Sequence, residues 1–155
     1  MWVTVWRHGE AGMAPRDEDR SLTDKGKQTV ESAAVEFQST LIRAGDPLPT
    51  RCAFSPLERT RQTAAILAAC WDINTRVCDA LAPGTDIERP DTFLLRDVEH
   101  QVIVSHQPFV SQIIWHWLDD DRLDSLLPGG WATLELLAPI RGGGRLIRSR
   151  PNVFS

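Results

Sequence analysis

Apolar residues along the chain fall into two alternating patterns. Short continuous runs, such as residues 2–6 and 101–104, are typical of strands that are buried in a sheet. Longer stretches repeat their apolar residues every three or four positions, as a helix with one buried face does. Residues 21–45 form the longest of these, and Thr23 and Gly45 are suitable as its N-cap and its left-handed end. Its apolar stripe consists of Val30, Ala34, Phe37 and Leu41.

The same patterns predict five further strands and three further helices. The expected strands cover residues 51–54, 75–78, 101–106, 131–137 and 145–150, with the glycines of 142–144 inside the last hairpin. The expected helices cover residues 55–70, a segment starting at Pro90 within 88–98, and residues 107–120 with Pro108 in the first turn. Alternating strands and helices predict an α/β fold of three layers (α/β/α), with a mostly parallel central sheet and antiparallel terminal strands.

Polar residues capable of chemistry follow three of the predicted strands. Arg7 and His8 end the first strand, Ser55 follows the second, and His106 ends the strand over 101–106. Ser55 is also a plausible N-cap, with Pro56 in the first helical position and Glu58 completing a capping box. In a parallel sheet, ligands bind at the carboxyl ends of the strands, so we expect these residues to meet at one edge.

The residues expected at this edge form a positively charged group. Arg59 lies one turn into its helix, on the side of Ser55, and joins Arg7, His8 and His106. Two helix N-termini would point backbone N–H groups at the same space. Two arginines, two histidines and two helix ends favour a bound phosphoryl group. Each part taken alone is more often a surface or packing feature, and it is their convergence that indicates a site.

Composition and charge narrow the possible functions. The 155 residues carry a net charge of −4, which does not favour nucleic-acid binding and makes any anion site local. The length suits one domain over residues 1–155. No apolar run is long enough to cross a membrane. The cysteines show no ligand spacing, so we expect reduced, mostly packed thiols in a cytoplasmic protein with no metal and no cofactor. They are Cys52, Cys70 and Cys78.

Four motifs resemble those of the histidine phosphatase superfamily, which is also called phosphoglycerate mutase-like. They are "RHGEA", "RSLTDKG", "SPLERTRQTA" and "VIVSHQPFV", in this order, and the resemblance runs from residue 2 to about residue 118. The sequence is most similar to the small SixA-type phosphohistidine phosphatases, whose closing strands the tail from "WATLEL" to "RPN" also resembles.

The resemblance implies a role for each matched residue. His8 would be the nucleophile that forms a phosphohistidine intermediate, and Arg7, Arg59 and His106 would hold the phosphoryl oxygens. Arg20 matches an arginine that this branch keeps near the site. Ser55 lies at the same site, and Gly9 allows the backbone to approach the phosphate closely. A neutral imidazole is the nucleophilic form, and arginines offset the charge on the transferring oxygens.

One residue that many superfamily members have is missing here. They place a carboxylate after the third strand as general acid, where this sequence reads Leu81-Ala82-Pro83. Asp86 is the better substitute and Glu88 the second, although both are equally well explained as solvated loop charges. A histidine leaving group needs an acid least, because its conjugate acid has a pKa of about 6.5. The missing acid therefore favours a phosphohistidine substrate, as does a chain with few residues for a lid.

Three functions remain open from the sequence. The first is a phosphohistidine protein phosphatase that acts on a phosphorylated protein such as a histidine phosphotransfer domain. The second is a phosphatase for small phosphoesters, and the third is a module that binds phosphate or phosphoprotein without turnover. His100 and His116 are expected to be structural, and Glu10 either touches the site or faces solvent. The helix with "IIWHWL" is expected to be core, with a partner surface as the alternative.

Overall fold

The computed structural model describes residues 1–152 and contains one six-stranded sheet. The strand order is β3-β2-β4-β1-β5-β6, in which β3, β2, β4 and β1 run parallel and β5 and β6 are antiparallel to their neighbours. This confirms the predicted α/β class with antiparallel terminal strands. The strands are β1 (Trp2–Arg7), β2 (Arg51–Phe54), β3 (Asn74–Val77), β4 (His100–Ser105), β5 (Trp131–Leu136) and β6 (Gly144–Arg150).

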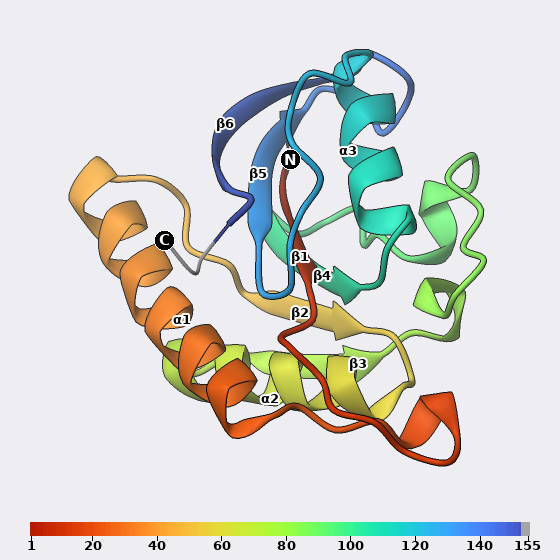
Figure 1. The fold of residues 1–155 in the computed structure, drawn as a ribbon. Coiled ribbons are helices and arrows are strands. Elements are labelled where there is room, and N and C mark those ends of the chain that lie inside the picture. Colours follow the sequence, from red (N-terminus) through yellow and green to blue (C-terminus); the bar gives the residue numbers. More distant parts are fainter. Residues whose placement is uncertain (153–155) are drawn as a thin grey trace.

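Helices cover both faces of the sheet. Figure 1 shows α1 and α2 together on one side and α3 on the other, which gives the expected three layers. The long helices are α1 (Asp24–Ala44), α2 (Glu58–Trp71) and α3 (Phe109–Leu118), and the short 3-10 turns are η1 (Asp17–Asp19), η2 (Asp79–Leu81) and η3 (Pro90–Thr92).

Two hydrophobic cores lie on opposite faces of the sheet. On the side of α3, Val3, Val5 and Ile103 pack against the buried face of that helix, which includes Trp117. On the side of α1 and α2, Trp6 packs among aromatic and aliphatic side chains that include Phe37, Leu67, Trp71 and Trp131. All six residues of β4 are buried, as a strand covered on both faces requires.

Helix α1 forms where the sequence predicts it. The Thr23 hydroxyl accepts a hydrogen bond from the backbone N–H of Gly26 at 2.9 Å, and Gly45 ends the helix with a φ of 69°. The predicted apolar stripe is buried in the core. The tryptophan-rich helix α3 also places its main face in the core, with Trp117 fully buried.

Two predicted helix features are wrong. Helix α2 begins at Glu58 with Leu57 as N-cap, so Ser55 caps nothing and Glu58 closes no capping box. The Ser55 hydroxyl instead bonds His106, and the Glu58 carboxylate pairs with Arg61.

The helix predicted from Pro90 is a single 3-10 turn, Pro90–Thr92. The side-chain amide of Gln101 accepts from the N–H of Leu95 and donates to its carbonyl, at 2.9 and 2.7 Å. These are the backbone groups that a helix would need for its own hydrogen bonds. Phe93 and Leu94 are nevertheless buried, which explains their apolar character.

The register of the parallel strands brings their carboxyl ends to one edge. Arg7 pairs with Ser105, and Phe54 pairs with Val104. The pairing continues one residue further, because the N–H of His8 donates to the Ser105 carbonyl and that of Ser55 donates to the Val104 carbonyl. No helix within residues 1–152 is long and apolar enough to span a membrane.

Candidate active site

His8 stands directly after β1 with its ring orientation fixed. Its Nδ1 lies 2.7 Å from the carbonyl oxygen of Gly9. A carbonyl oxygen only accepts, so Nδ1 carries the proton of the neutral ring and Nε2 is the unprotonated nitrogen, whose lone pair can accept a hydrogen bond or attack an electrophile. The His8 residue is only 8% exposed, so its ring is largely removed from water.

Arg59, on the first turn of α2, contacts that nitrogen. Its Nε donates to His8 Nε2 at 3.3 Å, while its Nη1 donates to the backbone oxygen of Asp17 at 2.8 Å. Arg59 is 6% exposed, so its charge is largely removed from water. Arg7 donates from Nη1 to the Leu126 carbonyl, and its own Nε is buried without a partner.

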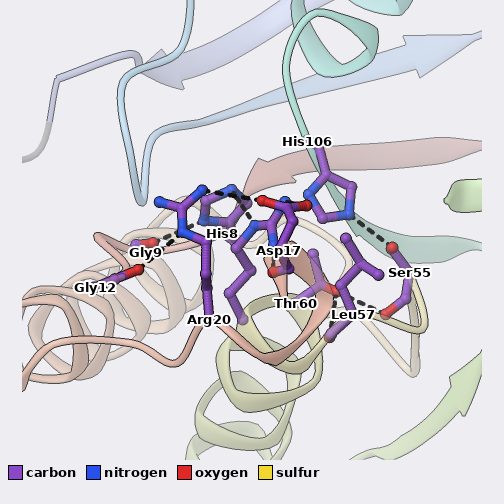
Figure 2. Close-up of polar contacts among 10 residues, drawn as sticks. His8, Gly9, Gly12, Asp17, Arg20, Ser55, Leu57, Thr60 and His106 are labelled. Carbon is purple, nitrogen blue, oxygen red and sulfur yellow. Dashed lines mark hydrogen bonds and ion pairs between the residues drawn. The ribbon is translucent and has the colours of Figure 1, made fainter. Parts of the chain in front are cut away.

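His106 approaches His8 from the end of β4. The two ring centroids are 5.3 Å apart. His106 Nε2 lies 2.7 Å from the Ser55 hydroxyl, and its Nδ1 is buried without a protein partner. Figure 2 shows the ring held on the Ser55 side, with the other ring nitrogen on the side of Asp17. His106 therefore keeps one nitrogen available for a bound group.

Arg20 enters from the segment between β1 and α1. Its Nε donates to the Gly12 carbonyl at 2.8 Å, and its Nη1 contacts the Asp17 carboxylate at 3.3 Å. The Asp17 carboxylate also lies 3.1 Å from Arg59 Nη2, so it bridges both guanidiniums (Figure 2). The residues brought together at this edge are called the His8 cluster, which consists of Arg7, His8, Arg20, Ser55, Arg59 and His106.

The backbone after His8 is held by α1 and α2. The N–H of Gly9 donates to the Thr63 hydroxyl at 3.1 Å. The Glu10 carboxylate accepts from the Thr23 hydroxyl, so Glu10 supports the start of α1 rather than facing free solvent. A Cβ on Gly26 would lie 2.3 Å from the Glu10 backbone oxygen, so only glycine allows α1 to pack this closely against residues 9–10.

Burial and neighbouring charges keep both histidines neutral. Burial, together with the charges of Arg59, Arg7 and Arg20, lowers the pKa of His8 to about 4, against the opposing effect of the Gly9 carbonyl. Burial lowers the pKa of His106 to about 3, with further contributions from His8 and Arg59. The Arg59 and Arg20 guanidiniums hold the pKa of the Asp17 carboxyl below its usual range. At neutral pH the site thus combines a neutral imidazole, three guanidiniums and one carboxylate.

Asp86, His100 and His116 lie outside the His8 cluster and have other contacts. The Asp86 carboxylate accepts from the N–H of Glu88, and the surface hollow that it lines is formed by residues 79–92. His100 lies between the Thr4 hydroxyl and the Pro47 carbonyl, at 2.8 and 2.7 Å, as a structural histidine does. The ring of His116 is buried on α3, with Glu88 4.0 Å from its Nε2.

Sequence reasoning missed Asp17 and Thr63. The available signal for Asp17 was the acidic turn "DED" directly before Arg20, which reads as an ordinary solvated turn. Thr63 follows Arg59 by one helical turn, the spacing that places both side chains on one face of α2.

A buried neutral histidine beside several guanidiniums defines a site suited to covalent phosphoryl transfer. The model of the histidine phosphatase superfamily (branch 1) matches residues 3–82. The chain therefore belongs to the histidine phosphatase superfamily. A search of curated proteins finds no match.

Solved structures share the fold over nearly the whole chain. The protein histidine phosphatase SixA complexed with tungstate is 22% identical with a TM-score of 0.80, and 97% of each chain is covered. A SixA from Agrobacterium tumefaciens is 22% identical with a TM-score of 0.78, covering 96% of each chain. The α-ribazole phosphatase of Shigella flexneri is 16% identical with a TM-score of 0.67, covering 99% of this chain and 97% of that one. At these identities the likeness shows the fold.

Proposed function

We propose that this chain, as a single domain over residues 1–155, is a metal-independent phosphohistidine protein phosphatase. His8 is the nucleophile, and the observation that carries this role is its ring geometry. The Gly9 carbonyl holds the Nδ1 proton, so the lone pair of Nε2 is directed to the side of Arg59. A neutral imidazole with its unprotonated nitrogen beside a guanidinium suits attack on phosphorus, once the phosphoryl group takes over the Arg59 N–H that now contacts Nε2.

The remaining cluster residues hold the transferring oxygens. Arg7, Arg20 and Arg59 supply positive charge, and His106 supplies the hydrogen-bond donor that Ser55 leaves free. Gly9, outside this cluster, serves packing instead, because a Cβ there would lie 2.8 Å from Val30 Cγ2 of α1. Attack by His8 Nε2 breaks the bond from phosphorus to the leaving group, whose atom keeps the electron pair. Water then attacks the phosphohistidine and forms a new P–O bond, the electron pair of the P–N bond returns to Nε2, and the protons of the water leave with the phosphate or pass to solvent. Splitting the hydrolysis into two steps lowers each barrier.

The substrate class follows from what surrounds the nucleophile. The only carboxylate that the hydrogen bonds of residues 1–152 place on the His8 cluster is Asp17, and the guanidiniums that lower its pKa keep it ionised. A site whose carboxylate has no proton to give suits a leaving imidazole better than a leaving alkoxide. The higher TM-scores with the two SixA proteins, 0.78 and 0.80, than with the α-ribazole phosphatase, 0.67, favour the same choice. The three cysteines are all free, as is usual for proteins of a reducing compartment such as the cytoplasm.

The test compares phosphate release from a phosphorylated histidine phosphotransfer domain and from an aryl phosphate, with His8→Ala as control. We expect faster release from the phosphoprotein, and its loss in the variant. Faster release from the aryl ester would assign the enzyme to small phosphoesters, and would make Asp86 the next carboxylate to replace. Phosphoprotein binding without any turnover would make the chain a binding module.

A further inference from the structure

The Asp17 carboxylate occupies the donors that a phosphoryl group would use. One of its oxygens lies 3.1 Å from Arg59 Nη2 and the other 3.3 Å from Arg20 Nη1. Two oxygens bridging two guanidiniums repeat what two phosphoryl oxygens would do at the same place. Figure 2 shows the carboxylate beside His8, between Arg20 and His106. The substrate and Asp17 therefore compete for the same N–H groups.

The free protein has a physical reason to keep this contact. The side chain of Arg59 is only 7% exposed, and a buried charge without a counter-charge is costly. Asp17 supplies that charge from outside, since its own side chain is 64% exposed. The internal anion thus stabilises the arginine while the site holds no substrate.

The contact can be released without unfolding the turn. Arg59 holds Asp17 in two separate ways, with Nη1 on its backbone oxygen and Nη2 on its carboxylate. Rotation of the exposed side chain frees Arg59 Nη2 and Arg20 Nη1, while the backbone bond keeps η1 in place. A phosphoryl group can therefore enter by displacing one carboxylate.

We propose that Asp17 is an internal competitor of the substrate, an anion that an arriving phosphoryl group must displace from Arg20 and Arg59. This inference rests on the proposed function and deepens it. A ligand that must first displace a bound group binds more weakly. Its apparent dissociation constant equals the intrinsic one divided by the fraction of molecules in which the site is open. Free inorganic phosphate has no other contacts to compensate for this loss. A phosphoryl group on a protein bears the same loss, but contacts from its carrier offset it, so Asp17 limits retention of the phosphate product while the phosphoprotein still binds.

The test measures binding of inorganic phosphate by calorimetry to the wild-type protein, Asp17→Asn and Asp19→Asn. Asp19 is the matched control because it lies in the same turn and pairs with the exposed Arg16 instead. We expect Asp17→Asn to bind phosphate at least tenfold more tightly, and Asp19→Asn to bind as the wild type does. Without phosphate, Asp17→Asn should also unfold at a lower temperature, because Arg59 loses its counter-charge. Asp17→Ser serves as a second variant with the same expectation.

Unchanged or weaker phosphate binding in both Asp17 variants would overturn the proposal, since it would mean that the carboxylate only positions the arginines. Equal tightening in Asp19→Asn would also overturn it, by making the effect one of general surface charge. These titrations need no turnover. If His8→Ala kept full phosphatase activity, the proposed function would fail while the phosphate affinities still decided the role of Asp17.

Discussion

Replacing Ser55 by alanine isolates how the site orients His106. The Ser55 hydroxyl is fully buried and lies 2.7 Å from His106 Nε2. When Ser55 donates this bond, the ring proton of neutral His106 sits on Nδ1, the nitrogen on the side of Asp17 (Figure 2), where the proposal places the phosphoryl group. Ser55→Ala removes that restraint and leaves the ring with no protein partner, because Nδ1 already has none.

The expected cost follows from this geometry. A buried imidazole nitrogen left without a hydrogen bond costs about 1–3 kcal/mol of unfolding free energy. For a chain of this size each kcal/mol lowers Tm by about 2–4 °C. Loss of the fixed tautomer weakens the donor to the transferring oxygens, and we expect kcat to fall about tenfold, equivalent to about 1.4 kcal/mol.

The assay is steady-state phosphate release with parallel thermal unfolding, using Ser105→Ala as the matched control. Ser105 is also a buried serine at the end of a strand, but its hydroxyl donates to the Leu81 carbonyl at 2.8 Å. Ser105→Ala should lose similar stability and keep its kcat. An unchanged kcat in Ser55→Ala, or an equal fall in both variants, would refute the orienting role.

Three further predictions concern the same site. Arg59→Lys keeps the charge but loses the guanidinium fork, so kcat/KM for an aryl phosphate should fall by about 10²-fold in steady-state kinetics, and near-wild-type kinetics would count against it. Gly26→Ala should lower both Tm and kcat, because its Cβ would meet the Glu10 backbone at 2.3 Å, whereas Gly12→Ala has 3.9 Å of clearance and should change neither. An NMR titration should find His8 neutral down to about pH 4, since burial lowers its pKa to about 4, and a midpoint near 6.5 would contradict this. The unfolded state takes up the His8 proton first, so stability should fall as pH drops from about 6.5 to about 4.

The sheet, and the edge where the carboxyl ends of its strands carry the His8 cluster, could be predicted because the sequence patterns that indicate them are local and regular. The apolar run of β4 and the stripe of α1 each match one regular period, and Thr23 and Gly45 mark the ends of that helix. Once the strands are parallel, their carboxyl ends must share an edge. His8, Ser55 and His106 then follow from counting along the chain.

The errors arise where a side chain serves a distant partner. Ser55 looks like a helix cap by its neighbours, but its hydroxyl bonds His106, which is 51 residues away. The segment after Pro90 has helical composition, yet Gln101 from β4 takes the backbone groups of Leu95. Asp17 reads as a solvated turn, and only the fold reveals its contact with Arg59. A pattern of neighbouring residues does not predict hydrogen bonds to residues so far away in the sequence.

The most direct test of the central claim is to trap the phosphorylated enzyme. The protein is mixed with a radioactively phosphorylated histidine phosphotransfer domain, quenched within milliseconds to seconds, and its peptides are mapped. We predict an acid-labile, alkali-stable label on the peptide that contains His8, and no label in His8→Ala. Continued turnover with no label on His8, or a label on another residue, would contradict His8 as the nucleophile.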